Sequence, residues 1–151
     1  MNKSCNLHIY TDGSHIKGTN VKGYGAWCEH EGKEYWISQC CNSIKTVSNP
    51  TMELMACCKV LETFQGCQVH MLIYIDYIGV SRWIQGRWAA KKPYIKVLVD
   101  RCKEYIKTID GIITFVDVPA HSGIKGNEKA DEAAKSGKNI NTFIELRKII
   151  M

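Results

Sequence analysis

The alternation of apolar and polar positions in the first forty residues predicts three strands. Residues 7–11 alternate and end at 12–14, a pattern typical of a strand that runs into a turn. The runs 25–29 and 34–38 are rich in aromatic and aliphatic residues and flank a turn sequence at 31–33. We therefore expect a first strand followed by a hairpin.

Longer patterns divide the rest of the chain into helices and strands. The apolar run 71–75 ends at Asp76 and predicts a strand buried on both faces, and a second β-rich run lies at 111–118. Asn49 is suited to cap a helix and Pro50 to its first position. Helices are predicted at 50–64, 80–85, 94–107 and 127–136. This order indicates an α/β fold with a mixed sheet and helices on its faces.

The last residues differ in character from the body of the chain. We place one domain at 1–137, without internal repeat or linker, and a tail at 138–151. In the tail, Thr142 and Glu145 match a capping box, and apolar residues recur at helical spacing over 143–150. We expect a short amphipathic helix that packs on its own domain, with a partner interface as the alternative.

Composition indicates an ordinary folded protein. The chain has 151 residues, 45% hydrophobic and 23% charged, which fits one globular domain and excludes a disordered or collagenous chain. No apolar run approaches the roughly 20 residues that a membrane helix needs, and the polar start lacks the core of a secretory signal. We expect an intracellular protein, cytoplasmic or nuclear, whose eight cysteines are free thiols because they form no C-x-x-C motif.

Positive charge is concentrated in one segment. The whole chain carries a net charge of +5, whereas residues 82–107 hold eight basic and two acidic residues, a net charge of +6. Trp83, Trp88 and Tyr94 are interleaved with these charges. Such a composition suits a nucleic-acid backbone, with aromatic rings against bases or sugars. A solvated helical face is the alternative explanation.

Four acidic residues stand where carboxylates could gather. Asp12 and Asp76 each follow an apolar strand, and if the strands are neighbours both carboxylates emerge at the same sheet edge. Glu53 lies toward the apolar side of its predicted helix, where it needs a basic partner or a metal. Asp131 lies in the first turns of the last helix. Each aspartate alone also has a structural explanation, as a turn or helix-dipole residue.

Converging carboxylates repel one another unless divalent cations bind between them. Oxygen ligands without paired histidines or thiolates favour Mg²⁺ or Mn²⁺ over zinc. Two such ions about 4 Å apart can activate a water and stabilise the leaving oxygen of a phosphodiester. The carboxylates therefore raise the hypothesis of a metal-dependent nuclease.

Four segments resemble, in order, the motifs of type 1 ribonuclease H. They are 10–14, 52–56, 75–76 and 118–131, and the resemblance extends over about residues 5 to 137. It implies a ribonuclease H-like α/β fold with a five-stranded mixed sheet flanked by helices. It also implies an Mg²⁺-dependent endoribonuclease that hydrolyses the RNA strand of RNA/DNA hybrids with two metal ions. The expected products carry 5′-phosphate and 3′-hydroxyl ends.

Carried over by motif position, the resemblance assigns roles to individual residues. Asp12, Glu53, Asp76 and Asp131 become the metal ligands. His121, in a loop that contains two glycines, resembles the family histidine that assists proton transfer or product departure. The other four histidines have no such context and are expected to be structural.

The resemblance also implies substrate contacts, because proteins distinguish RNA from DNA through the 2′-hydroxyl. Ser48 and Asn49 match positions near the minor groove and a phosphate, and Trp83 matches a residue that meets the sugars of the DNA strand. The lysines at 91 and 92 would attract phosphates in a salt-sensitive way. The predicted contacts are Gly13, Ser14, Ser48, Asn49, Trp83, Gln85, Lys91 and Lys92.

The chain departs from the family pattern close to these positions. Pro50 stands where an amide side chain is usual, and it cannot donate a hydrogen bond to a 2′-hydroxyl. The segment after Asp76 is shorter than in typical relatives by about four residues, close to one helical turn. Tyr77 therefore replaces a small polar neighbour of a metal ligand.

Other functions remain open from the sequence. Strand transfer or resolvase cleavage on the same fold is disfavoured by the histidine-bearing loop. A noncatalytic nucleic-acid module has no reason to place four carboxylates beside phosphates, and a generic nucleotide-binding domain lacks a phosphate-cradling glycine loop. We expect a monomer that binds RNA/DNA hybrid, without membrane contact or an obligate protein partner.

Overall fold

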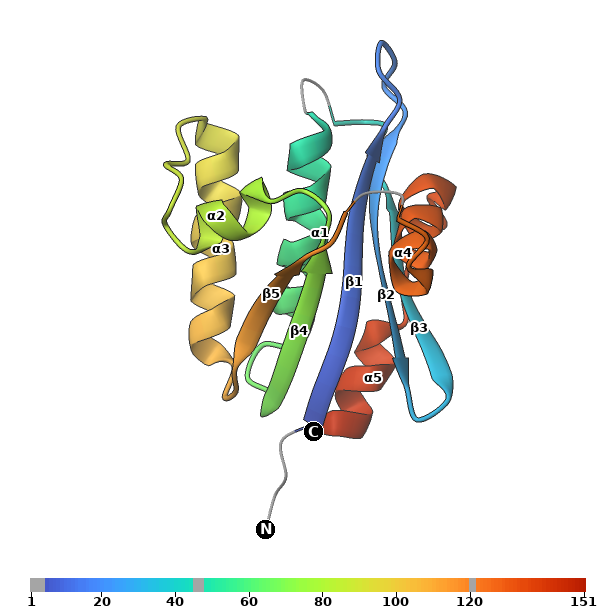
Figure 1. The fold of residues 1–151 in the computed structure, drawn as a ribbon, viewed down its shortest axis with the longest axis vertical. Helices are drawn as coiled ribbons and strands as arrows, with labels where there is room; N and C mark the ends of the chain where they lie inside the picture. Colours follow the sequence, from blue (N-terminus) through green and yellow to red (C-terminus); the bar gives the residue numbers. More distant parts are fainter. Residues whose placement is uncertain (1–4, 45–47, 120–121) are drawn as a thin grey trace.

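One mixed sheet organises the computed structural model, which describes residues 5–44, 48–119 and 122–151 (Figure 1). In chain order the strands are β1 Cys5–His15, β2 Lys22–His30, β3 Lys33–Cys40, β4 Val69–Ile75, β5 Ile113–Asp117 and β6 Ile140–Asn141. They lie in the order β5-β4-β1-β2-β3-β6. The pairs β1–β4 and β4–β5 are parallel, and the others are antiparallel. The predicted fold class is confirmed, with β6 as a short sixth strand.

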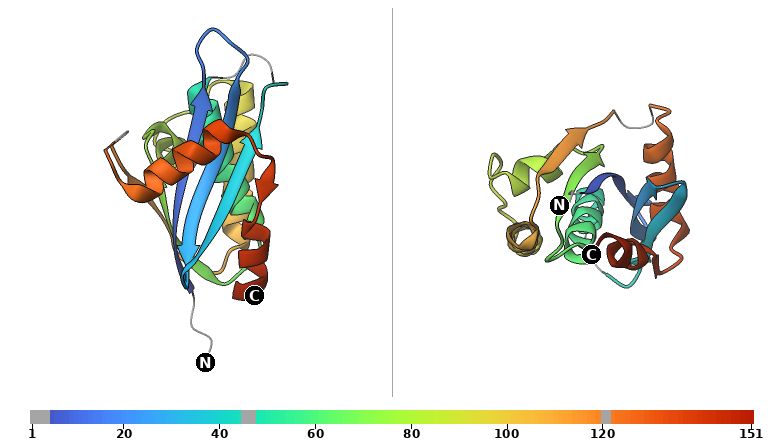
Figure 2. Two further views of the ribbon diagram at one scale, coloured as in Figure 1. Left: turned by 90° about the vertical axis from the view of Figure 1, so that its right-hand side faces the viewer. Right: turned by 90° about the horizontal axis from the view of Figure 1, so that it is seen from below.

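Helices cover the two faces of this sheet unequally. They are α1 Asn49–Thr63, α2 Gly79–Ile84, α3 Pro93–Thr108, α4 Lys125–Ser136 and α5 Phe143–Ile150. Helices α1, α3 and α5 lie on one face, and α4 lies across β1, β2 and β3 on the other (Figure 2). Among the described helices, none combines the length and the apolar composition needed to cross a bilayer.

Strand β1 is longer than predicted. The expected turn at 12–14 is wrong, because Asp12 pairs with Gly25 and Gly13 with Tyr24 in the antiparallel ladder with β2. The chain turns only beyond His15, where the amide of Thr19 donates to the carbonyl of Ile16 over 3.1 Å. Pairing with β2 satisfies the backbone N–H and C=O groups of residues 12–15, and this pairing outweighs the local preference of the sequence for a turn.

Two other local predictions need correction. Ser48, not Asn49, is the N-cap of α1, and its side chain makes no capping hydrogen bond. Strand β4 is not buried on both faces, because Leu72 and Tyr74 are only half-buried. Helix α4 packs on β1 to β3 and leaves this side of β4 open. The predicted hairpin is confirmed as β2 and β3.

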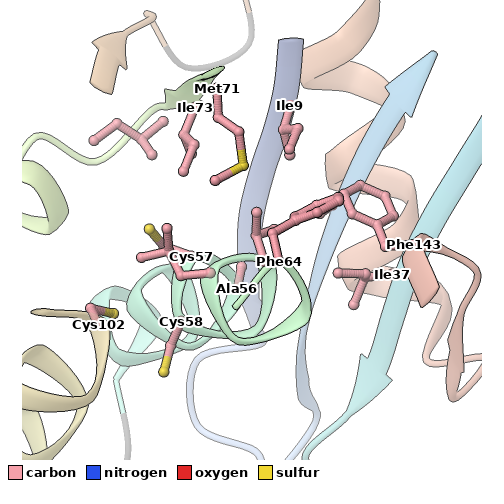
Figure 3. Packing of buried hydrophobic residues seen from close by; sticks show 14 of the residues in the cluster. Ile9, Ile37, Ala56, Cys57, Cys58, Phe64, Met71, Ile73, Cys102 and Phe143 are labelled. Atoms are coloured by element: carbon pink, nitrogen blue, oxygen red, sulfur yellow. The ribbon is translucent and has the colours of Figure 1, made fainter. Parts of the chain in front are cut away.

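The core lies between the sheet and α1 (Figure 3). Ile9, Ile37 and Ile73 point from the sheet toward α1, and the rings of Phe64 and Phe143 lie 6.1 Å apart between their centroids. Burial of such apolar surface is the main stabilising contribution. The seven cysteines with described side chains are free thiols, as predicted; the side chain of Cys5 lies outside the described part.

The tail completes this core. Phe143 and Leu146 are fully buried, which confirms that the C-terminal helix packs on its own domain. The predicted capping box does not form. Instead, the Thr142 hydroxyl accepts a hydrogen bond from the Trp36 amide over 2.8 Å and ties the tail to β3. Arg147 donates to the carbonyl of Thr63 at the C-terminus of α1, where a cation is favourable.

Candidate active site

Three carboxylates meet at the end of β4. The parallel register pairs Tyr10 with Tyr74, so Asp12 lies beside Asp76, which follows the last residue of β4. Glu53 reaches the same point from the first turns of α1. One carboxylate oxygen of each of these three residues lies within 4.8 Å of the other two. The structure thus brings together three of the four residues predicted as metal ligands.

Glycines on the strands allow the helices to approach this closely. A Cβ atom at Gly13 would collide with the α1 backbone at Glu53, so the helix lies directly on β1. On the other face, a Cβ at Gly25 would collide with α4 at Ala134. The amide of Gly13 donates to Oδ1 of Asp12 over 2.9 Å and orients its carboxylate. These two glycines therefore determine how closely α1 and α4 pack on the sheet, and so how close the carboxylates on these helices lie to β1.

Burial makes this cluster electrostatically unfavourable without a cation. Asp12 and Glu53 are only 4% and 3% exposed, and Oε2 of Glu53 has no hydrogen-bond partner in the described part of the chain. Burial, together with the charges of Asp76 and Asp131, raises the pKa of Asp12 to about 7. Burial and the neighbouring Asp12 also raise the pKa of Glu53. An unsatisfied buried oxygen among carboxylates fits a hard divalent cation.

Asp131 occupies the rim of the same cavity, which has a volume of about 230 Å³. It lies on α4, and its Oδ2 is 2.9 Å from Nζ of Lys135, one turn further along. Asp131 lies outside the group of three, but its side chain interacts with Asp12 and contributes to the raised pKa of that residue. The predicted catalytic His121 lies outside the described residues.

A second cavity, of about 260 Å³, adjoins the carboxylates. Four predicted substrate contacts line it: Ser48, Trp83, Lys91 and Lys92. Gly13 and Asn49 line the carboxylate cavity instead. Ser14 lies in a groove beside the β1–β2 hairpin, and Gln85 is exposed at the end of α2, so neither lines these two cavities.

The family assignment follows from comparison with known proteins. A family model described as RNase H matches residues 4–139. The chain belongs to the ribonuclease H family. Ribonuclease H of Francisella philomiragia subsp. philomiragia is 32% identical over 142 residues, which cover 87% of this chain and 90% of that protein. Ribonuclease H of Edwardsiella ictaluri is 31% identical over 139 residues, 85% of this chain and 87% of that protein.

Solved ribonuclease H structures share the fold. LC11-RNase H1 in complex with RNA/DNA hybrid is similar with a TM-score of 0.71 and 22% identity, over 87% of this chain and 95% of that one. RNase H1 of the archaeon Halobacterium salinarum NRC-1 has a TM-score of 0.68 and 20% identity, over 87% and 96% of the two chains. The predictions of family, fold and a ribonuclease H enzyme are therefore confirmed.

Some residues at the ribonuclease H site were not predicted from the sequence as contacts. Pro50 and Tyr77 line both cavities, and Ala89, Tyr94 and Ile95 line the second. Tyr94 could have been predicted from the sequence, because it lies in the basic segment 82–107. In the structure, Nζ of Lys92 lies 5.9 Å from the centroid of its ring. Ala89 and Ile95 had none, because small and aliphatic side chains carry no chemical signature.

Proposed function

We propose that the chain hydrolyses the RNA strand of RNA/DNA hybrids with the help of two divalent cations. The observation that carries the proposal is the group of three buried carboxylates with an unpartnered oxygen on Glu53. The family supports it, and LC11-RNase H1, which has the same fold, is solved in complex with RNA/DNA hybrid.

Asp12, Glu53 and Asp76 would hold the cations, with Asp131 as a fourth ligand from the rim. Bound there, divalent cations supply Lewis acidity for the attacking water and charge stabilisation for the leaving oxygen. The residues that the structure describes around this cavity offer carboxylate oxygens and no imidazole or thiolate, which favours Mg²⁺, with Mn²⁺ as a substitute.

Other residues bind and orient the nucleic acid. Lys91 and Lys92 attract phosphates at the second cavity, and Trp83 presents its ring to a sugar. Asn49 can face a 2′-hydroxyl from the carboxylate cavity. Water attacks the phosphorus and the bond to the 3′ oxygen breaks, which leaves 5′-phosphate and 3′-hydroxyl ends. His121 would assist proton transfer or product departure.

The same proposal assigns a part to each region of the chain. All five proposed catalytic residues precede position 137, so residues 1–137 would carry the chemistry. Residues 138–151 would stabilise that core through β6 and α5. We propose a monomer, which light scattering of the purified protein would test.

A strand-labelled hybrid tests the proposed substrate. The RNA strand of the hybrid should be cut in Mg²⁺, whereas its DNA strand, duplex RNA, duplex DNA and single strands of the same sequence should stay intact. End analysis of the fragments should find 5′-phosphate and 3′-hydroxyl groups. A hybrid that is bound but uncut in Mg²⁺ and in Mn²⁺ would instead indicate a noncatalytic binding module.

A further inference from the structure

Three cysteine side chains form a thiol cluster between α1 and α3. Cys57 and Cys58 are neighbours on α1, and Cys102 lies on α3. The side chain of Cys102 points from α3 toward α1, between the sulfur atoms of the other two (Figure 3). All three residues are buried, and none of them lines the carboxylate cavity or the cavity of Lys91 and Lys92, the lysine cavity. The proposed nuclease chemistry therefore makes no use of this thiol cluster.

The three thiols contact one another in a chain. The Cys58 thiol donates a hydrogen bond to Sγ of Cys102, and the Cys102 thiol donates one to Sγ of Cys57. The first hydrogen bond, together with burial, raises the pKa of Cys58, and the second raises the pKa of Cys102. Both groups are therefore neutral thiols in the metal-free protein, and each must release a proton in order to bind a cation.

The chemistry of this donor set favours a soft cation. Thiolate sulfur selects Cu(I) or Zn²⁺, whereas Mg²⁺ prefers oxygen ligands. A structural zinc site needs four ligands, and the thiol cluster offers three. Among the described residues, the three carboxylates have oxygens that all lie within 4.8 Å of one another, but the three sulfur atoms do not. An ion bound by two sulfur atoms, one of them from the central Cys102, is the arrangement that fits.

Cys58 is better placed than Cys57 to supply the second sulfur. It is 6% exposed, whereas the other two cysteines are fully buried, so an ion can enter beside it. The positive charge of Arg101, which precedes Cys102 on α3, also favours the Cys58 thiolate. We propose that Cys58 and Cys102 form a binding site for one Cu(I) ion between α1 and α3. Binding releases two thiol protons to the solvent and leaves a group with one negative charge near Arg101.

Competition with bicinchoninate, a chelator that is coloured when it holds Cu(I), tests the proposed site. The reduced full-length protein is added to the coloured complex without oxygen, and we expect it to withdraw one equivalent of Cu(I). Cys58→Ala and Cys102→Ala should each bind Cu(I) more than about a hundredfold more weakly, because loss of a ligand exceeds the effect of losing a residue that only supports one. X-ray absorption of the loaded protein should show two sulfur neighbours of the copper and no nitrogen or oxygen neighbour.

Cys67→Ala is the matched control. Cys67 is also buried, but it lies outside α1 and α3 and near Arg147, so this variant should retain the Cu(I) affinity of the unsubstituted protein. Circular dichroism verifies that each variant is folded, and Cys58→Ser serves as a second variant that keeps the size of the side chain without its soft sulfur.

Two results would overturn the proposal. One is a Cu(I) affinity in folded Cys58→Ser or Cys102→Ala equal to that of the unsubstituted protein. The other is failure of the unsubstituted protein to withdraw Cu(I), which would leave the three cysteines as small apolar residues of the core. Hybrid cleavage takes no part in this measurement, so its outcome is independent of the proposed function.

Discussion

Removing the charge of Asp12 is expected to stabilise the metal-free protein. Asp12 is 4% exposed and its carboxylate is close to two others, and burial is the main reason that its pKa is raised from 3.8 to about 7. One pKa unit corresponds to about 1.4 kcal/mol, so ionised Asp12 destabilises the metal-free fold by up to about 4 kcal/mol. Asp12→Asn removes this charge and keeps an oxygen for the Gly13 amide. We expect a gain in unfolding free energy of about 2–4 kcal/mol at pH 8.

The pH dependence of this gain follows from the direction of the shift. An unfolded chain loses the Asp12 proton near pH 4, whereas the folded protein retains it until about pH 7. The folded state therefore binds more protons in this window, and its stability falls as pH rises. Asp12→Asn lacks this titration. Its advantage over the unsubstituted protein should be close to zero at pH 4 and reach its full size above pH 7.

Urea unfolding in EDTA at pH 4 and pH 8 measures the effect. Asp117→Asn serves as the control, because Asp117 is exposed at the end of β5 and lines neither cavity. Addition of Mg²⁺ at pH 8 should stabilise the unsubstituted protein far more than Asp12→Asn, since only the former keeps the full ligand set. An equal difference at both pH values, or a less stable Asp12→Asn in EDTA at pH 8, would refute the electrostatic argument.

Three further predictions concern the core, the strand glycine and the lysine cavity. Phe143→Ala should lower the free energy of unfolding by about 3–5 kcal/mol in urea titrations, whereas Ile144→Ala, at an exposed position, should change it by less than about 0.5 kcal/mol. Gly13→Ala should destabilise the fold by about 1–3 kcal/mol and reduce hybrid cleavage, because α1 must move away from β1; unchanged activity would contradict the close approach. Replacing Lys91 and Lys92 by alanine should raise KM for the hybrid and reduce the slope of log KM against log salt concentration by about one to two. The same slope for this variant as for the unsubstituted protein would exclude phosphate contact by these lysines.

The sequence was most informative where one periodicity dominates a segment. The run 71–75 and the helix after Pro50 were found because their patterns extend over several residues. The convergence of Asp12 and Asp76 could be anticipated, since neighbouring parallel strands end at one edge. The burial of Glu53 followed from its place on the apolar side of its helix.

Long-range partners account for what the sequence did not reveal. Strand β1 continues past Asp12 because β2 pairs with it, and β6 has only two residues, too few for a periodicity. The capping box at Thr142 is replaced by hydrogen bonds to Trp36, which lies 106 positions away in the chain. None of these contacts is local in sequence.

The most direct test of the central claim is single-turnover cleavage of the labelled hybrid by two aspartate variants at the same sheet edge. Asp76 lines the carboxylate cavity, whereas Asp117, at the end of the adjacent strand, does not. We predict that Mg²⁺ supports cleavage by the unsubstituted protein and by Asp117→Asn, and that EDTA abolishes this cleavage. Asp76→Asn should cleave at least about a thousandfold more slowly than the unsubstituted protein, because charge stabilisation of the transition state is lost. Comparable rates for Asp76→Asn and Asp117→Asn, or cleavage that persists in EDTA, would contradict the account.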